Sequence, residues 1–128
     1  MSYYFSKKVN EGFDEAIEKV TAALKEEGFG VLTEIDVKET LKKKLDVDFK
    51  KYKILGACNP NFAHQALSEE DKIGVMLPCN VVVEENEDGS VEVTAVDPMA
   101  SMSAVENENL GSIAKDVQSR LKKVVDNL

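Results

Sequence analysis

The sequence predicts an α+β fold, with a mostly antiparallel five-stranded sheet and two long helices packed on one of its faces. Segments with alternating apolar residues, typical of strands, are interleaved with segments that repeat apolar residues every three or four positions, typical of helices. The predicted order is β-α-β-α-β-α-β-β-α. Two of the helical segments are long and apolar on one side, so each would cover part of a sheet.

The first strand and helix are expected over residues 2–9 and 13–27. Residues 2–9 alternate in polarity and carry aromatic side chains, a strand pattern. The helix is indicated by six apolar residues on one stripe: Phe13, Ala16, Ile17, Val20, Ala23 and Leu24. Gly28 follows as a typical helix stop.

A second strand and a short helix are expected next. The strand covers residues 29–37, with four side chains on one face: Val31, Thr33, Ile35 and Val37. Asp36 and Glu39 have the spacing of a capping box, which predicts a helix start. We expect Leu41 and Leu45 of this helix to face inward and the lysines between them to be solvated, because the chain is acidic.

A third strand is expected over residues 52–58 and is followed by a strong helix start. Asn59 would cap the helix, and Pro60 suits its first position, where no backbone N–H is needed. The helix would run to about residue 68, with a buried side made of Ala63, Ala66 and Leu67. Residues 73–85 then predict a long strand, in which Pro78 marks a bulge or an edge.

The last third of the chain predicts a hairpin and a long helix. Asp88-Gly89 is a hairpin-turn signal, and residues 90–96 would form the partner strand. Asp97-Pro98 repeats the cap-then-proline pattern before a short segment. Asn107 is expected to cap the final helix. Its stripe has the clearest helical period in the chain: Leu110, Ile113, Ala114, Val117, Leu121, Val124 and Leu128.

Length and charge exclude several classes of protein. A chain of 128 residues fits one domain, expected over residues 1–128. Its net charge of −8 argues against nucleic acid and anionic membranes as partners, because both favour a basic face. The most apolar stretch, residues 73–83, is about half the ~20 residues of a membrane span. With no signal-peptide pattern at its start, we expect a soluble cytoplasmic protein with reduced thiols.

Residues 56–80 hold both cysteines, the only histidine and two of the three prolines. Cys58 would end a strand just before a helix start, where the helix dipole lowers the pKa of a thiol. His64 lies six residues further on, and Cys79 stands beside Asn80. This segment is therefore the candidate site.

Three functional interpretations of this segment compete. Cys58, His64 and Cys79 would supply three ligands for zinc, although the sequence has no Cys-x-x-Cys pair and no second histidine. Alternatively, Cys58 would be a catalytic or redox thiol, with His64 as its base and Cys79 as the resolving thiol. A third interpretation is a small anion bound at the Asn59-Pro60 helix start.

A plainer interpretation assigns no chemistry to the segment. Free cysteines are among the most buried residues and behave as small hydrophobes. A lone histidine on a helix is usually a surface residue. The protein would then be an interaction module that forms a homodimer through an edge or a face of its sheet.

Several segments resemble the uncharacterised bacterial and archaeal family called domain of unknown function 302. The match extends over nearly the whole chain, and the segments that carry it are residues 13–17, 27–36, 53–60 (Lys-Ile-Leu-Gly-Ala-Cys-Asn-Pro), 63–67, 77–83 (Leu-Pro-Cys-Asn-Val-Val-Val) and 96–98. The resemblance implies a curved antiparallel sheet with two helices, similar to the TATA-binding-protein-like architecture, and no established activity. It places the family's signature on Cys58, Asn59, Pro60, His64, Pro78, Cys79, Asn80, Asp97 and Pro98.

Taken together, the sequence favours thiol-based redox chemistry or small-ligand binding at Cys58, His64 and Cys79. Asn59, Asn80 and Asp97 are candidate ligand-binding residues. A metal-binding protein and a homodimeric interaction module are the alternatives, and whether the protein is an enzyme stays open.

Overall fold

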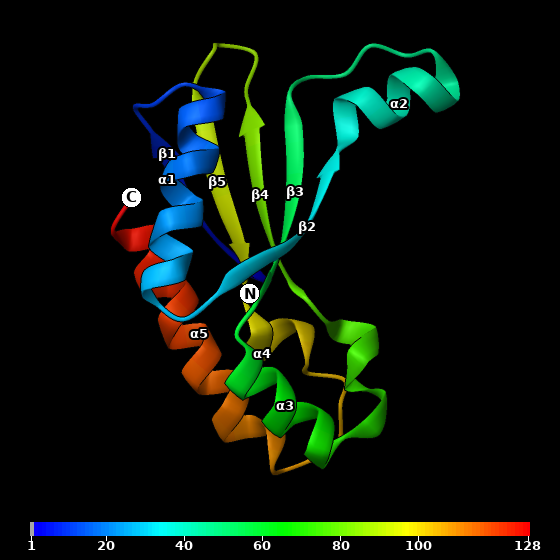
Figure 1. The fold of residues 1–128 in the computed structure, drawn as a ribbon, viewed down its shortest axis with the longest axis vertical. Helices are drawn as coiled ribbons and strands as arrows, with labels where there is room; N and C mark the ends of the chain where they lie inside the picture. Colours follow the sequence, from blue (N-terminus) through cyan, green and yellow to red (C-terminus); the bar gives the residue numbers. More distant parts are fainter. Residues whose placement is uncertain (1) are drawn as a thin grey trace.

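Five strands form one antiparallel sheet in the order β1-β5-β4-β3-β2 in the computed structural model, which describes residues 2–128 (Figure 1). The strands are β1 (Tyr4–Val9), β2 (Gly30–Asp36), β3 (Tyr52–Cys58), β4 (Cys79–Glu85) and β5 (Val91–Val96). Neighbouring strands pair antiparallel throughout. The predicted α+β fold is confirmed.

The helices are α1 (Phe13–Glu26), α2 (Val37–Leu45), α3 (Pro60–Glu69), α4 (Pro98–Ser101) and α5 (Leu110–Asp126), with a 3₁₀ helix η1 (Asp71–Met76). The two long helices, α1 and α5, lie side by side against the same face of the sheet (Figure 1). Within residues 2–128, no helix has the length and apolar character needed to cross a membrane.

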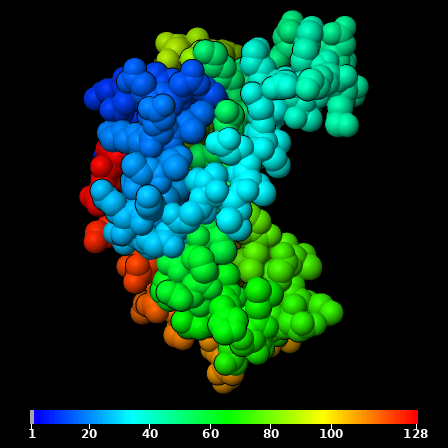
Figure 2. Space-filling model, viewed as in Figure 1, coloured from blue at the N-terminus to red at the C-terminus, as the bar shows by residue number. Residues whose placement is uncertain are grey.

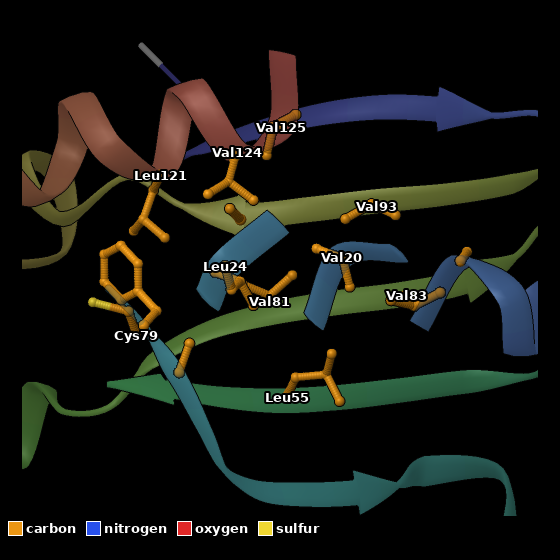
Figure 3. Close-up of a cluster of buried hydrophobic side chains, with 14 of the residues drawn as sticks. Val20, Leu24, Leu55, Cys79, Val81, Val83, Val93, Leu121, Val124 and Val125 are labelled. Carbon is orange, nitrogen blue, oxygen red and sulfur yellow. The ribbon is translucent and has the colours of Figure 1, made fainter. Parts of the chain in front are cut away.

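The main core lies between the sheet and these two helices. Alternate strand residues point into it, and Figure 3 shows Val81, Val83 and Val93 facing side chains of both helices. Val20 and Leu24 of α1 and Leu121 of α5 are the large residues opposite them, all fully buried. The predicted helical stripes therefore form the core, as their spacing indicated.

A smaller apolar cluster lies beyond one end of the sheet. There, α3, η1 and α4 pack with the first half of α5 (Figure 1). Ala66, Ile73 and Leu110 are buried in this cluster. At the opposite end, α2 and the loop after it stand out from the body (Figure 2). In this view β2 lies between α2 and the smaller cluster. The α5 helix thus spans both apolar clusters.

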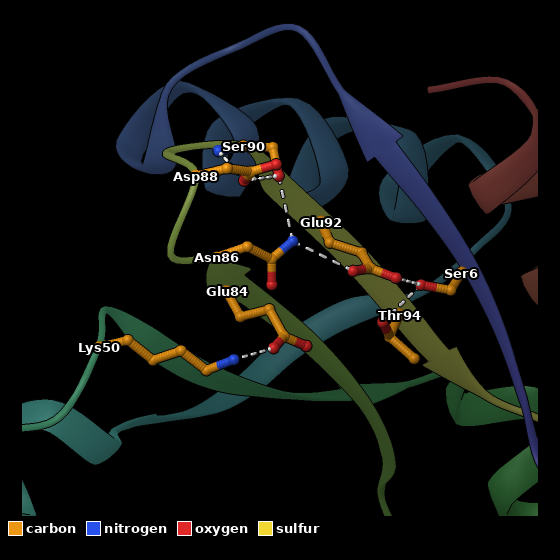
Figure 4. A network of polar contacts seen from close by, with 8 residues as sticks. All are labelled: Ser6, Lys50, Glu84, Asn86, Asp88, Ser90, Glu92 and Thr94. Carbon is orange, nitrogen blue, oxygen red and sulfur yellow. Dashed lines mark hydrogen bonds and ion pairs between the residues drawn. The ribbon is translucent and has the colours of Figure 1, made fainter.

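The face of the sheet turned away from α1 and α5 is polar near the β4–β5 hairpin (Figure 4). Ser6 and Asn86 donate hydrogen bonds to the Glu92 carboxylate, and the Lys50 ammonium lies 2.6 Å from a carboxylate oxygen of Glu84. The hydrogen bonds from Ser6 and Asn86 hold the pKa of Glu92 below its usual value, and the Ser6 hydroxyl is the larger cause. Partnered carboxylates thus occupy this part of the open face.

Two strand predictions were wrong. The segment before Cys79 is not a strand, because Ile73 turns into the second cluster through η1 while Val75 stays in solvent. Residues Val31, Thr33 and Ile35 also do not share one face. A bulge between Val31 and Thr33 shifts the register, as bulges do, so that Val31 pairs with Ala57 on the core face.

The predicted helix starts are mostly confirmed. The Asp36, Asn59 and Asp97 side chains accept backbone N–H groups of α2, α3 and α4. Asn107, however, does not cap α5: it precedes the cap position, which Asn109 occupies.

The expectation that Leu45 faces inward was also wrong, since 67% of this residue is exposed. The α2 helix projects from the sheet and buries no residue.

Candidate functional site

A cavity of about 330 Å³ lies where the two apolar clusters meet. Its walls come from the end of β3, the start of β4, helix α3 and the first half of α5. The inward side chains are almost all apolar, and several are small: Ala57, Ala63, Ala66 and Ala114. Because alanine leaves the space that a larger side chain would fill, these residues keep the cavity open.

Cys58 and Cys79 both line this cavity. Cys79 is the first residue of β4 and pairs with Ala57, the neighbour of Cys58 on β3. Figure 3 shows Cys79 at the end of the row of buried side chains that runs along β4 through Val81 and Val83. The register of two adjacent strands therefore brings to one cavity two thiols that are 21 positions apart in the sequence.

The two thiols have different surroundings. Cys79 is buried, whereas Cys58 is half-buried, and both are free. Burial, and to a smaller extent the negative charge of a Cys58 thiolate, raise the pKa of the Cys79 thiol to about 11. Cys79 is therefore a neutral thiol at physiological pH and a weak nucleophile, since the thiolate is the reactive form.

Asn59 joins the cavity wall to the loop after α1. Its amide donates to the backbone oxygen of Glu27 at 3.4 Å, and its side-chain oxygen accepts the N–H of Phe62 at 3.5 Å. Gly28 has a positive φ of 86°, and a Cβ at this position would lie 2.9 Å from the Asn59 amide nitrogen. This buried amide is the only buried polar side chain among residues 2–128, and its partners fix it in the wall.

His64 does not line the cavity with the thiols. It is exposed on another side of α3, where it lines a separate polar hollow with Asn61, Gln65 and Arg120. In the part of the chain that the structure describes, no group of three or more histidine, cysteine or acidic residues is placed to hold a metal ion. The sequence hypothesis of a zinc site at Cys58, His64 and Cys79 therefore finds no support in the geometry.

Asn80 and Asp97 also lie away from the cavity wall. Asn80 is exposed and pairs with Gly56 on β3. Asp97 accepts the backbone N–H of Met99 and the side-chain amide of Gln118, each at 3.0 Å. Asp97 thus fixes α4 against α5, and of the three predicted ligand-binding residues only Asn59 lines the cavity.

Sequence reasoning missed the apolar lining and Arg120. The alanines of α3 and α5 looked like ordinary positions of buried helix faces, because a helical stripe does not show where two clusters leave a gap. Arg120 has a signal of its own, since it is the only arginine in the sequence. Chemically, the cavity suits a small apolar molecule in contact with two thiols and one amide.

Comparisons with known proteins agree with the resemblance seen in the sequence. The family model described as "Domain of unknown function DUF302" matches residues 5–128. The chain is similar to a solved structure titled "Crystal structure of uncharacterized conserved protein DUF302 from Bacillus stearothermophilus". The two are 33% identical, with 98% of each chain covered and a TM-score of 0.91. No curated protein matches the chain.

Proposed function

The chain belongs to the DUF302 family, whose description assigns no activity, and from the cavity we propose that the protein binds a small, largely apolar molecule. The observation that carries the proposal is the cavity of about 330 Å³ between the sheet end, α3 and α5. This volume falls within the roughly 300–1,000 Å³ of small-molecule sites. Such a space is large for a packing defect, because protein interiors leave few voids larger than a water molecule.

The polar groups of the wall are few, as in many ligand pockets. Asn59 offers an amide that is already held by two partners, so it would orient a ligand without having to be ordered first. The sulfur atoms of Cys58 and Cys79 are polarisable and suit contact with apolar or aromatic groups. The wall therefore favours binding through shape and apolar contact, with one amide to set orientation.

Two leucines that line the cavity are also exposed to solvent. Leu32 of β2 is 68% exposed and Leu67 of α3 is 45% exposed, and both also line the cavity. An apolar ligand that covered these two leucines would remove their apolar surface from water, which is favourable. The rim thus supports an apolar ligand that enters from solvent.

A matched pair of variants tests the proposal with an uncharged apolar probe, N-phenyl-1-naphthylamine. We expect saturable fluorescence enhancement with the native protein. Ala63→Leu, at a half-buried lining position of α3, is expected to weaken binding about tenfold by filling the space. Ala22→Leu, at an exposed position of α1, is the control and should bind as the native protein does. Absence of saturable binding, or equal binding by the two variants, would contradict the proposal.

Thiol redox chemistry is the second candidate, favoured by the placement of both thiols on one cavity. Cys58 and Cys79 would form a disulfide, releasing two protons and passing two electrons to a disulfide oxidant, which becomes two thiols. Incubation with oxidised glutathione followed by mass spectrometry tests this candidate. An intramolecular Cys58–Cys79 disulfide would support it, whereas stable mixed disulfides on Cys58 alone would count against it.

A further inference from the structure

A polar hollow adjoins the apolar cavity and shares part of its wall. Asn59 and Phe62 line both spaces. The hollow is also lined by His64 and Gln65 of α3 and by Arg120 of α5. Arg120 and His64 are the only arginine and the only histidine in the sequence. The fold thus places the one guanidinium of the chain beside the wall of the proposed ligand cavity.

Arg120 is held in place without being neutralised. Its guanidinium lies over the ring of Phe62, 5.2 Å from the ring centroid, and donates one hydrogen bond to the backbone oxygen of Glu27 at 3.2 Å. A guanidinium has five N–H donors, so most remain available. The Glu27 carboxylate is paired instead with Lys123, at 3.5 Å.

The second acidic neighbour, Asp116, also leaves the Arg120 guanidinium without an ion pair. Asp116 lies one turn before Arg120 on α5 and lines a neighbouring hollow with it. Even so, no ion pair joins Arg120 to any carboxylate of residues 2–128. An arginine fixed by an aromatic ring and a carbonyl is prepared to bind a planar carboxylate.

We propose that the ligand is a small amphipathic carboxylate, whose apolar part fills the cavity and whose carboxylate is bound by Arg120. The inference rests on the proposed function, because it places the body of the ligand in the same cavity. It adds a chemical class for the ligand. Asn59 and Phe62 would contact the ligand where it passes from the apolar cavity to the polar hollow.

The net charge of the chain makes a local cation favourable for binding such a ligand. The protein carries a net charge of −8, so its surface on average repels a carboxylate. A charged hydrogen bond at Arg120 would overcome this repulsion at one point only. The competing arrangement has the polar end of the ligand leaving between Leu32 and Leu67, and in that arrangement Arg120 would not affect binding.

The test compares octanoate with 1-octanol, which share a chain length and differ in the head group. Each would displace N-phenyl-1-naphthylamine from the native protein, from Arg120→Gln and from Lys115→Gln. Lys115 is an exposed lysine of the same helix that lines neither space, so its variant controls for the loss of one positive charge. We expect Arg120→Gln to weaken octanoate binding roughly five- to tenfold and octanol binding less than twofold. Lys115→Gln should leave both within about twofold of the native values.

The outcomes separate this inference from the proposed function. If the neutral probe and octanol bind but Arg120→Gln does not weaken octanoate selectively, the carboxylate inference is overturned and the apolar site stands. If neither the probe nor octanol binds the native protein, the site itself is refuted. If Arg120→Gln weakened the binding of octanoate and 1-octanol equally, Arg120 would have a structural role through Phe62, and the inference would also be overturned.

Discussion

Cys58 and Cys79 line one cavity from adjacent antiparallel strands, yet only Cys79 is buried. Strand pairing explains the proximity, since Cys79 lies opposite Ala57, the residue before Cys58. Cys79 begins β4 and is buried in the main core, whereas Cys58 is the last residue of β3, where the chain passes into α3. Two thiols of the same cavity should therefore differ in chemistry.

Thiol labelling should distinguish the two cysteines. At pH 8, Cys79 with a pKa of about 11 would be only about one-thousandth thiolate, and its burial also limits access. We expect one thiol of the native protein to react rapidly with 5,5′-dithiobis(2-nitrobenzoic acid) and Cys58→Ser to lose this rapid phase. Cys79→Ser should keep it. A rapid phase that persists in Cys58→Ser would contradict the assignment.

Alkaline pH should destabilise the native protein through Cys79. Its pKa rises from an ordinary value of 9.0 to about 11 on folding, because burial disfavours the thiolate. The unfolded chain therefore loses this proton first, so stability is intact below pH 9 and falls as the pH rises toward 11. The loss from this group is roughly 2–3 kcal/mol. Urea unfolding at several pH values should show a shallower decline for Cys79→Ala than for the native protein.

Gly56 should not tolerate a side chain. A Cβ at this position of β3 would lie 2.8 Å from Cγ of Pro78 and would also clash with the hydroxyl of Thr33. Both neighbours are held by strand pairing or a proline ring, so Gly56→Ala should cost about 1–3 kcal/mol. Gly30→Ala is the matched control, because nothing lies within 4 Å of a Cβ there. Urea unfolding would measure both variants, and equal stabilities would contradict the predicted clash.

Most of the fold could be predicted from the sequence because the local sequence signals agree with the tertiary structure. The α5 stripe, the Asp36, Asn59 and Asp97 caps and the turn at Gly89 depend on neighbours within a few positions. The strand predicted before Cys79 is wrong because a short apolar run fits a strand or a helical turn equally well. Contact of Ile73 with the second cluster decides between them, and that contact is not local.

The candidate site was only partly predictable for the same reason. The Cys58-Asn59-Pro60 segment showed where a strand passes into a helix, and the structure places Cys58 and Asn59 in a cavity wall. His64 is near the thiols in sequence, but its position on α3 places it on another side of the helix, in the polar hollow. Which residues meet across α3 and α5 depends on how two helices pack, so Arg120 could not be connected to Phe62 beforehand.

Acid should weaken the contact between Ser6 and Glu92 across strands β1 and β5. The Ser6 hydroxyl, and less strongly the Asn86 amide, lowers the pKa of Glu92 from its ordinary 4.5. The stabilisation is therefore complete at neutral pH and is lost as the pH falls below 4.5 through the lowered pKa. We expect Ser6→Ala to cost about 0.5–1 kcal/mol at pH 7, since the site is partly solvated, and less at pH 3. Ser112→Ala, at an exposed position of α5, is the control and should show no such pH dependence. An equal cost of Ser6→Ala at both pH values would assign its effect to the neutral hydrogen bond with Thr94, 2.9 Å away, instead of to the carboxylate.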